Sequence, residues 1–314
     1  MTARSESAPA KLNLGLRVVG LRSDGYHLLE SAFVPIDLAD RVLVELDPAG
    51  PRKVALAVEG GPPELADPAR NLAARAAAVF LEAAGIEASV RLSLEKRVPV
   101  GAGLGGGSSD AAAVLRALAA RFPGALESRA LADLALALGA DVPFFLDPRP
   151  ARVSGVGERI EPLPLAAVPI LVVTPFPPLA TREVFAAFDR DRGELTASGP
   201  GRNLARLPAL LVAEPADRSA DPDRSDSELA DSELTALLGN DLEPAATRLR
   251  PGIARVRAEI QRTGARAVGM SGSGPSVFGV FRDERSAQAA AERGRWEASD
   301  RVHVGRTLAS WGVV

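Results

Sequence analysis

The residues most able to do chemistry lie in one glycine-rich segment, residues 99–110. The segment reads PVGAGLGGGSSD and is followed by the helix-forming run AAAVLRAL. Because glycine has no side chain, the backbone N–H groups of such a loop can turn toward a ligand. Serine and aspartate favour a helix N-terminus, where unpaired N–H groups and the helix dipole attract an anion. The segment therefore predicts a phosphate-binding loop, and its length favours the polyphosphate of a nucleotide.

Two other kinds of phosphate loop fit this segment less well. Residues 101–106 match the pattern G-x-G-x-x-G, but a dinucleotide-binding fold needs a second strand, ending in an acidic residue, after the helix. Here the helix leads into RFPG at 121–124 and a second helical stretch at 131–138. A P-loop would end in Gly-Lys-Ser/Thr, which this loop lacks. A glycine-rich turn that binds no ligand is the remaining alternative.

A second glycine motif, GMSGSGPSVF, occupies residues 269–278. It lies between two strand-like patterns, so on its own it fits a flexible hairpin turn equally well. Because the chain also has the first glycine-rich loop, we favour a functional interpretation. In it, a turn without side chains lets two domains close over a polyphosphate and a substrate.

The composition restricts the class of protein. A chain of 314 residues with 46% hydrophobic and 25% charged residues predicts about two globular domains. The net charge of −3 argues against a nucleic-acid partner. The sequence has no apolar run near ~20 residues and no signal-peptide pattern, so we expect no membrane association and a cytoplasmic location. The chain has no cysteine and only two histidines, so it offers few ligands for a zinc site.

The elements that must position these motifs alternate irregularly along the chain. The pattern predicts strands at 9–19, 31–37, 41–46, 53–58, 89–95, 150–160, 168–173, 265–270 and 276–281, and further helices at 70–84 and 251–263. Without a strict strand–helix–strand rhythm, the fold class is α+β rather than a doubly wound sheet. Pro162–Pro164 is a candidate hinge between domains at 1–163 and 164–314. Residues 213–233, rich in Asp, Ser and Pro, are typical of a mobile insertion.

Several motifs together carry a family resemblance. Residues 9–14 (PAKLNL), 99–110 and 269–278 resemble, in this order, the signature segments of the GHMP small-molecule kinase superfamily. Within it, RSDGYH at 22–27, GADVPFF at 139–145 and NDLEP at 240–244 resemble the branch that acts on a cytidine-diphosphate-linked methylerythritol. The resemblance covers about residues 9 to 282, apart from the insertion. It implies an N-terminal ATP-binding domain, a C-terminal ferredoxin-like α/β domain and an active site in the cleft between them.

The resemblance also implies a reaction. It is the ATP- and Mg²⁺-dependent phosphorylation of the 2-hydroxyl of 4-diphosphocytidyl-2-C-methyl-D-erythritol, a small-molecule substrate of the non-mevalonate (methylerythritol phosphate) isoprenoid pathway. Two alternatives stay open: a sibling kinase acting on homoserine, mevalonate or a sugar, and a nucleotide-binding sensor without catalysis. The oligomeric state is open between a monomer and a homodimer.

Residue roles follow from the same resemblance. Asp141 is the expected general base, and Lys11 its partner, because an ammonium group nearby favours the charged carboxylate. Asp110 is expected to be only a residue of the helix N-terminus, and Lys53 and Lys96 to be incidental. The residues expected to hold the ATP phosphates are Pro99, Val100, Gly101, Ala102, Gly103, Leu104, Gly105, Gly106, Gly107, Ser108 and Ser109, with Ser108 or Ser109 as a possible Mg²⁺ ligand.

The acceptor is expected at a separate group of residues. The resemblance places Tyr26 and His27 at the cytosine, where an aromatic ring can stack and an imidazole can read the base edge. Asn13 is expected to hydrogen-bond the substrate. Phe185, with Thr181 nearby, is the expected second aromatic of this subsite, and Phe176 is its alternative.

Overall fold

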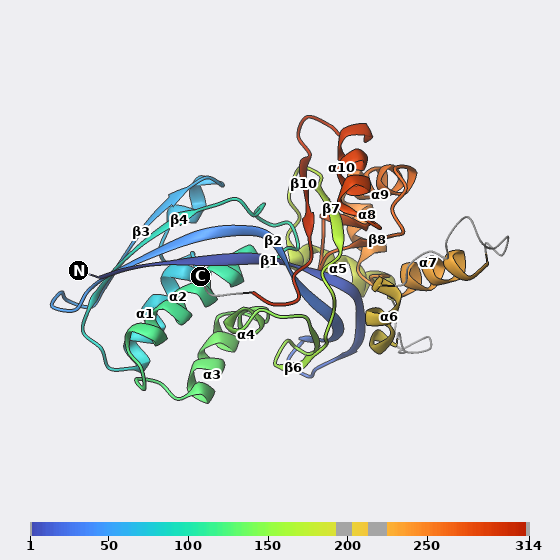
Figure 1. Cartoon of the computed structure of the whole chain (residues 1–314). Helices are drawn as coiled ribbons and strands as arrows, with labels where there is room; N and C mark the ends of the chain where they lie inside the picture. Colours follow the sequence, from blue (N-terminus) through green and yellow to red (C-terminus); the bar gives the residue numbers. More distant parts are fainter. Residues whose placement is uncertain (1, 193–202, 213–224, 312–314) are drawn as a thin grey trace.

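The computed structural model describes residues 2–192, 203–212 and 225–311, and it confirms the α+β class (Figure 1). The first sheet has the strand order β3-β4-β2-β5-β6, with β1 paired to β2. Its pairs are antiparallel except β3 with β4. Its strands are β1 (Thr2–Leu21), β2 (His27–Asp47), β3 (Lys53–Glu59), β4 (Ser89–Glu95), β5 (Ala151–Gly155) and β6 (Arg159–Pro162).

The helical segments of this half are the 3₁₀ turn η1 (Pro63–Ala66) and helices α1 (Leu72–Ala83), α2 (Gly106–Arg121), α3 (Ser128–Leu138) and α4 (Val142–Leu146). The alanine-rich helices α1 and α2 pack against the sheet. Small side chains let α1 and α2 approach each other and the sheet closely, so Phe80 and Leu115 are fully buried in one core with Leu92 of β4. This packing fixes the start of α2, where the glycine-rich loop ends.

The second sheet is antiparallel with the order β10-β7-β9-β8. Its strands are β7 (Pro169–Thr174), β8 (Ala267–Met270), β9 (Val277–Val280) and β10 (Arg301–Arg306). The helices and 3₁₀ turn of this half are α5 (Thr181–Arg192), η2 (Leu204–Arg206), α6 (Leu207–Val212), α7 (Ser225–Leu237), α8 (Glu243–Leu249), α9 (Gly252–Arg262) and α10 (Glu284–Arg293). Helices between β7 and β8, a β8–β9 hairpin and α10 before β10 give the expected ferredoxin-like succession.

Two expectations from the sequence are wrong. The strands expected at 31–37 and 41–46 form one continuous strand, β2, because its pairing with β1 continues across register shifts. The strand expected at 150–160 forms two strands, β5 and β6, because a turn at 156–158 reverses the chain. The end of the insertion expected at 213–233 is helical from Ser225 onward, and its mobility stays a prediction. Buried Leu234 and Leu238 anchor the end of that helix in the core, and this tertiary contact outweighs the polar composition before it. Residues 213–224 lie outside the described residues.

Strands β1 and β2 form a long ribbon that runs from the first half into the second (Figure 1). Leu12 and Leu14 of β1 share one apolar cluster with Ile170 of β7 and Phe278 of β9. The first sheet ends at β6 and the second begins at β7, so the change of sheet falls in the segment 163–168. The domain boundary at 163/164 itself stays a prediction. Among the described residues, no helix is both long and apolar enough to cross a membrane.

Candidate active site

A cavity of about 440 Å³ lies where the glycine-rich loop, β1 and the second glycine motif meet. The predicted site residues that line it are Lys11, Asn13, residues 99–108, Asp141, Thr181 and Phe185. The predicted residues that lie outside its lining are Ser109, Tyr26 and His27. The fold therefore brings segments more than 200 residues apart in the chain to one cavity.

Left-handed glycines shape the loop that forms one wall of this cavity. Gly101, Gly103 and Gly105 have φ angles of +63°, +75° and +74°, values that residues with a side chain rarely adopt. A Cβ atom on Gly103 would lie 2.2 Å from the carbonyl oxygen of Ser271. The loop consequently packs its backbone directly against the second glycine motif.

Hydrogen bonds from neighbouring elements hold two carbonyls of this loop in place. The Lys11 N–H donates to the Leu104 carbonyl at 2.9 Å, and the Ser271 hydroxyl donates to the Gly103 carbonyl at 2.9 Å. Helix α2 begins at Gly106, with Gly105 as its N-cap. Its first N–H groups have no acceptor within the helix, and Gly106, Gly107 and Ser108 line the cavity. This arrangement is suited to an anion.

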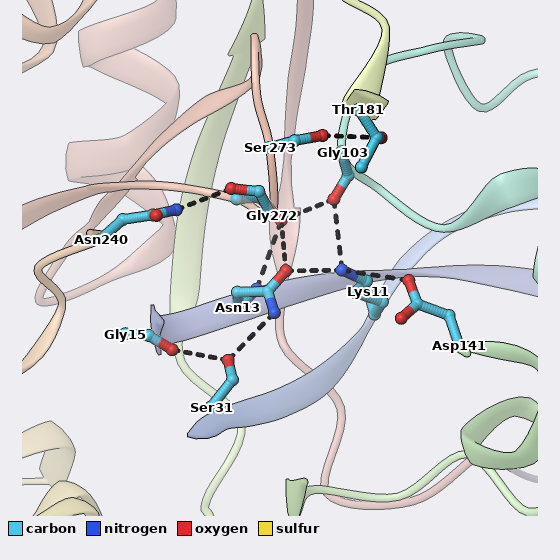
Figure 2. Close-up of polar contacts among 11 residues, drawn as sticks. Lys11, Asn13, Gly15, Ser31, Gly103, Asp141, Thr181, Asn240, Gly272 and Ser273 are labelled. Carbon is cyan, nitrogen blue, oxygen red and sulfur yellow. Dashed lines mark hydrogen bonds and ion pairs between the residues drawn. The ribbon is translucent and has the colours of Figure 1, made fainter. Parts of the chain in front are cut away.

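Lys11 and Asp141 form an ion pair in the lining of the cavity (Figure 2). The Lys11 Nζ lies 3.4 Å from Asp141 Oδ2, and the side-chain exposures are 4% and 31%. Lys11 therefore has a buried ammonium, whereas Asp141, the N-cap residue of α4, keeps access to a ligand. The ammonium also lies 4.6 Å from the centre of the Phe33 ring, a cation–π distance.

Asn13, two residues after Lys11 in β1, holds the lysine side chain. Its Oδ1 accepts from Lys11 Nζ at 2.5 Å, and its Nδ2 donates to the Ser31 hydroxyl at 2.9 Å. Ser31 in turn donates to the Gly15 carbonyl at 2.5 Å (Figure 2). Asn13 is 1% exposed, so its amide is fixed on both sides and its main contact is the lysine.

Asn240 is a positioning side chain to which the sequence analysis gave no role. Its Nδ2 donates to the Gly272 carbonyl at 2.7 Å (Figure 2) and to the Met270 carbonyl at 2.9 Å. Its Oδ1 accepts from the Leu242 N–H at 2.9 Å. Asn240 thus holds the second glycine motif in place. The sequence signal for this residue was its position in the family segment 240–244.

Of the residues expected at the acceptor, Asn13, Thr181 and Phe185 line the cavity, and His27 adjoins it through Phe185. Thr181 hydrogen-bonds Ser273 at 2.9 Å, and Phe185, one turn along α5, stacks on His27 with ring centres 4.6 Å apart. The His27 Nε2 lies 2.7 Å from Asp189 Oδ1. Tyr26 is 64% exposed, so its ring is available to a ligand. Phe176, the alternative to Phe185, lines a different cavity.

A buried ion cluster behind the loop corrects two expectations. Lys96 was expected to be incidental, and Asp110 to be only a residue of the helix N-terminus. The two form an ion pair at 2.5 Å. Lys96 also pairs with Asp40, whose other oxygen accepts from the N–H groups of Arg97 and Val98 at 2.6 and 2.8 Å. The cluster ties the beginning of the loop to the first turn of α2. Asp40 is distant in sequence, so no local pattern could reveal it.

Burial and repulsion change the ionisation of this cluster. Loss of hydration and then the Asp40 carboxylate raise the pKa of Asp110 to about 7, although the Lys96 ammonium opposes the change. Burial alone would lower the pKa of Lys96, but the two carboxylates raise it overall. One Asp110 oxygen is buried without a hydrogen-bond partner, as is the Ser109 hydroxyl. Asp110, which together with Lys96 also lines the cavity, therefore has a strongly perturbed proton affinity.

The two serines expected near a metal differ in position. Ser108 lines the cavity, whereas Ser109 is fully buried and lies outside the lining. Hydroxyl and carboxylate oxygens suit Mg²⁺, and this ion usually keeps few protein ligands beside phosphates and water. The described residues contain no group of three or more His, Cys, Asp or Glu that could hold a metal ion by themselves. Ser108, with Asp141 in the same cavity, fits such a shared site.

The fold and this site define a GHMP kinase. The family model of the GHMP kinases N terminal domain matches residues 71–147, and that of the GHMP kinases C terminal matches residues 223–295. A curated 4-diphosphocytidyl-2-C-methyl-D-erythritol kinase of Anaeromyxobacter sp. (strain Fw109-5) is 44% identical over 295 residues, 94% of this chain and 87% of that protein. The corresponding protein of Thermus thermophilus is 42% identical over 285 residues, 91% and 90% of the two chains. The chain belongs to the 4-diphosphocytidyl-2-C-methyl-D-erythritol kinase family.

Solved structures agree with this assignment. The crystal structure of a 4-(cytidine 5'-diphospho)-2C-methyl-D-erythritol kinase is similar with a TM-score of 0.74 and 39% identity, covering 98% of this chain and 100% of that one. A homoserine kinase from Cytophaga hutchinsonii gives a TM-score of 0.67 at 19% identity, covering 98% and 96%. The second likeness concerns the fold alone. The expected GHMP architecture is confirmed.

Proposed function

We propose that this protein transfers the γ-phosphoryl group of ATP to the 2-hydroxyl of 4-diphosphocytidyl-2-C-methyl-D-erythritol, a reaction of the methylerythritol phosphate isoprenoid pathway. One observation carries the proposal. In a chain of this family, a lysine–aspartate pair 3.4 Å apart lines the same cavity as a glycine-rich loop that opens a helix. Phosphoryl transfer depends mainly on positioning and charge stabilisation, and this cavity has groups for both.

The glycine-rich loop supplies the site for the polyphosphate. Its N–H groups at the start of α2 can donate to phosphate oxygens, and the helix dipole adds attraction for negative charge. The glycines keep side chains out of the space between these donors and a ligand. Residues 99–108 therefore bind and orient the ATP, with the buried Lys96–Asp40 pair supporting the loop from behind.

Asp141 and Lys11 supply the acid–base chemistry. The Asp141 carboxylate takes the proton of the acceptor hydroxyl while the hydroxyl oxygen forms a bond to the γ-phosphorus. The bond from that phosphorus to the β,γ-bridging oxygen breaks, and ADP is released. Lys11 offers positive charge to the carboxylate before transfer and to the phosphoryl oxygens during it. Asn13 and the Gly103 carbonyl, 2.5 and 3.4 Å from its Nζ, hold the ammonium in place.

A Mg²⁺ ion bound with ATP would neutralise phosphate charge at this site. Ser108 is the residue that would hold it, because its hydroxyl is at the cavity and that of Ser109 is not. Asp141 and Asp110 are the carboxylates of the same cavity lining, and Asp110 is already paired with Lys96. Most other ligands would then come from phosphates and water.

The acceptor's cytosine belongs beside Phe185. Its ring lines the cavity and stacks on His27, and the exposed ring of Tyr26 lies next to His27 in the chain. Stacking on a base contributes ~1–3 kcal/mol, while hydrogen bonds from an imidazole can read the base edge. Asn13 and Thr181 are further polar groups in the lining of the same cavity. Cytoplasmic location and a monomeric or homodimeric state stay predictions.

The test is ADP release from ATP and Mg²⁺ with 4-diphosphocytidyl-2-C-methyl-D-erythritol, beside homoserine, mevalonate and galactose as separate acceptors. We expect turnover with the cytidylyl acceptor, and a fall in kcat of about 10²–10⁴-fold in Asp141→Asn. Turnover with another acceptor in place of this one would identify a sibling kinase. ATP binding without turnover of any acceptor would identify a sensor, and full activity of Asp141→Asn would remove Asp141 as the base.

A further inference from the structure

Arg116 of α2 is a buried arginine that the proposed chemistry does not use. Its side chain is 11% exposed, and its guanidinium contacts three partners at once. It donates to the Phe145 carbonyl at 2.5 Å and to the Ser7 carbonyl at 2.9 Å, and its Nε lies 3.3 Å from Glu6 Oε2. The planar guanidinium can direct separate N–H groups to all three, which a lysine ammonium cannot do with the same geometry.

The partners of Arg116 belong to the two elements that carry the catalytic pair. Ser7 lies in β1, four residues before Lys11, and Phe145 lies in α4, four residues after Asp141. One side chain therefore connects the strand of the lysine to the helix that begins at the aspartate. Helix α4 has only five residues, so a contact from another element contributes substantially to holding it in position.

The Phe145 ring extends this connection to the site. A Cβ atom on Gly105 would lie 2.8 Å from the Phe145 ring and 3.2 Å from Lys11 Cγ, so the ring and the lysine stem both pack against the loop. Phe145 also contacts Phe144 edge to face at 5.1 Å, and Phe144 contacts Phe33 beneath the ammonium at 5.3 Å. Displacement of the Phe145 backbone would thus reach the lysine and the loop together.

The charges around Arg116 indicate a role in geometry rather than in net stability. Burial lowers the pKa of Arg116, and the carboxylate of Glu6 opposes that change. Glu6 itself is 3% exposed in its side chain. A buried ion pair adds little net stability over an apolar pair of similar volume, because both charges lose their hydration. Such a pair, with two carbonyls on separate elements, fixes the distance between those elements.

We propose that Arg116 is a positioning residue for phosphoryl transfer, setting the separation of Lys11 and Asp141 by holding α4 against β1. The inference rests on the proposed function for its kinetic consequence. Its structural part concerns only the distance between two side chains, so it can be tested separately.

The kinetic test compares Arg116→Met, Arg116→Lys and the double variant Glu6→Gln/Arg116→Met. The double variant matters most, because it removes both charges of the Arg116–Glu6 pair and is expected to fold; Glu6 also pairs with Arg4, at the protein surface. We expect the kcat of the double variant to fall about 10–100-fold, since catalysis is sensitive to misplacement on the 1 Å scale. The KM for ATP should stay within about twofold. We expect Arg116→Lys to have a similarly reduced kcat, because lysine keeps the positive charge but lacks the planar set of N–H donors. The control Arg91→Met, at a side chain 60% exposed, should match the wild type.

The structural test is the Lys11 Nζ–Asp141 Oδ2 distance in crystals of the double variant and of the wild type. Lengthening beyond the 3.4 Å of the intact pair supports the inference. An unchanged distance with an unchanged kcat overturns it, even where the melting temperature falls. Full rescue of kcat by Arg116→Lys also overturns it, because charge alone would then suffice. If the wild type does not phosphorylate the cytidylyl acceptor, the proposed function fails and the distance alone decides this inference.

Discussion

Gly103 and Gly107 lie in the same glycine-rich segment, yet the structure predicts opposite effects of alanine on stability. Gly103 has φ of +75°, and an added Cβ would lie 2.2 Å from the Ser271 carbonyl oxygen. A left-handed residue with a side chain costs about 1–2 kcal/mol, and forcing an atom into a packed region costs about 1–3 kcal/mol more. Gly103→Ala should therefore lower the free energy of unfolding by roughly 2–5 kcal/mol.

Gly107 has none of these constraints. It is the second residue of α2, and the nearest atom to an added Cβ is Leu72 Cδ1 at 3.8 Å, an ordinary contact. Alanine in a helix is more stable than glycine by about 0.5–1 kcal/mol, so Gly107→Ala should raise the free energy of unfolding by that amount. The new methyl group would nevertheless stand beside the free N–H groups that line the cavity. The KM for ATP should rise roughly tenfold, the loss of about 1.4 kcal/mol of binding.

The assay is urea unfolding followed by circular dichroism for the wild type and both variants, together with initial rates of ADP release at varied ATP. Gly103→Ala is the matched comparison, because the added atom is the same. A Gly107→Ala protein less stable than the wild type would refute the reasoning, since the fold would then need that glycine. A Gly103→Ala protein within about 1 kcal/mol of the wild type would refute the estimate of strain and clash.

Two further predictions concern the buried cluster and the acceptor subsite. Because the pKa of Asp110 is raised to about 7, the folded protein keeps a proton that the unfolded chain releases near pH 4. The unfolding free energy of the wild type, relative to Asp110→Asn, should therefore fall by up to ~1.4 kcal/mol per pH unit between about pH 4 and 7 in urea titrations, and a rising difference would contradict this. Phe185→Leu should raise the KM for the cytidylyl acceptor by the equivalent of about 1–3 kcal/mol and leave that for ATP unchanged in initial-rate measurements. An equal rise in both constants would instead indicate damage to the whole cavity.

Local patterns predicted the parts of the fold that depend on local physics. The glycine-rich segment and the alanine run after it predicted a helix start with free N–H groups, and α2 begins at Gly106. Short apolar runs predicted β7, β8 and β9 within a few residues. The extent of β2 could not be predicted, because register shifts in its pairing with β1 let the strand continue where the alternation of apolar residues breaks.

The candidate site depended on the family resemblance more than on spacing. Lys11 and Asp141 are 130 positions apart, and no periodicity connects them. The structure places them in contact, while their catalytic roles stay a proposal. Asp40 and Arg116 could not be found from the sequence, because each acts through partners on other elements. Such residues carry no local signal, since only the tertiary fold creates their neighbours.

The β1–β2 ribbon restricts how the cavity can change its width. Besides the segment 163–168, β1 also joins the two halves, and its Leu12 and Leu14 are buried in a cluster with residues of the second sheet. The Leu308 N–H adds a further link, donating to the Pro35 carbonyl of β2 at 2.8 Å. A rigid rotation of the two halves about the segment 163–168 would separate the buried side chains of this shared cluster. We therefore expect nucleotide entry and ADP release to involve bending of the ribbon or movement of the loops at the cavity's edge, with the two sheets keeping their mutual orientation.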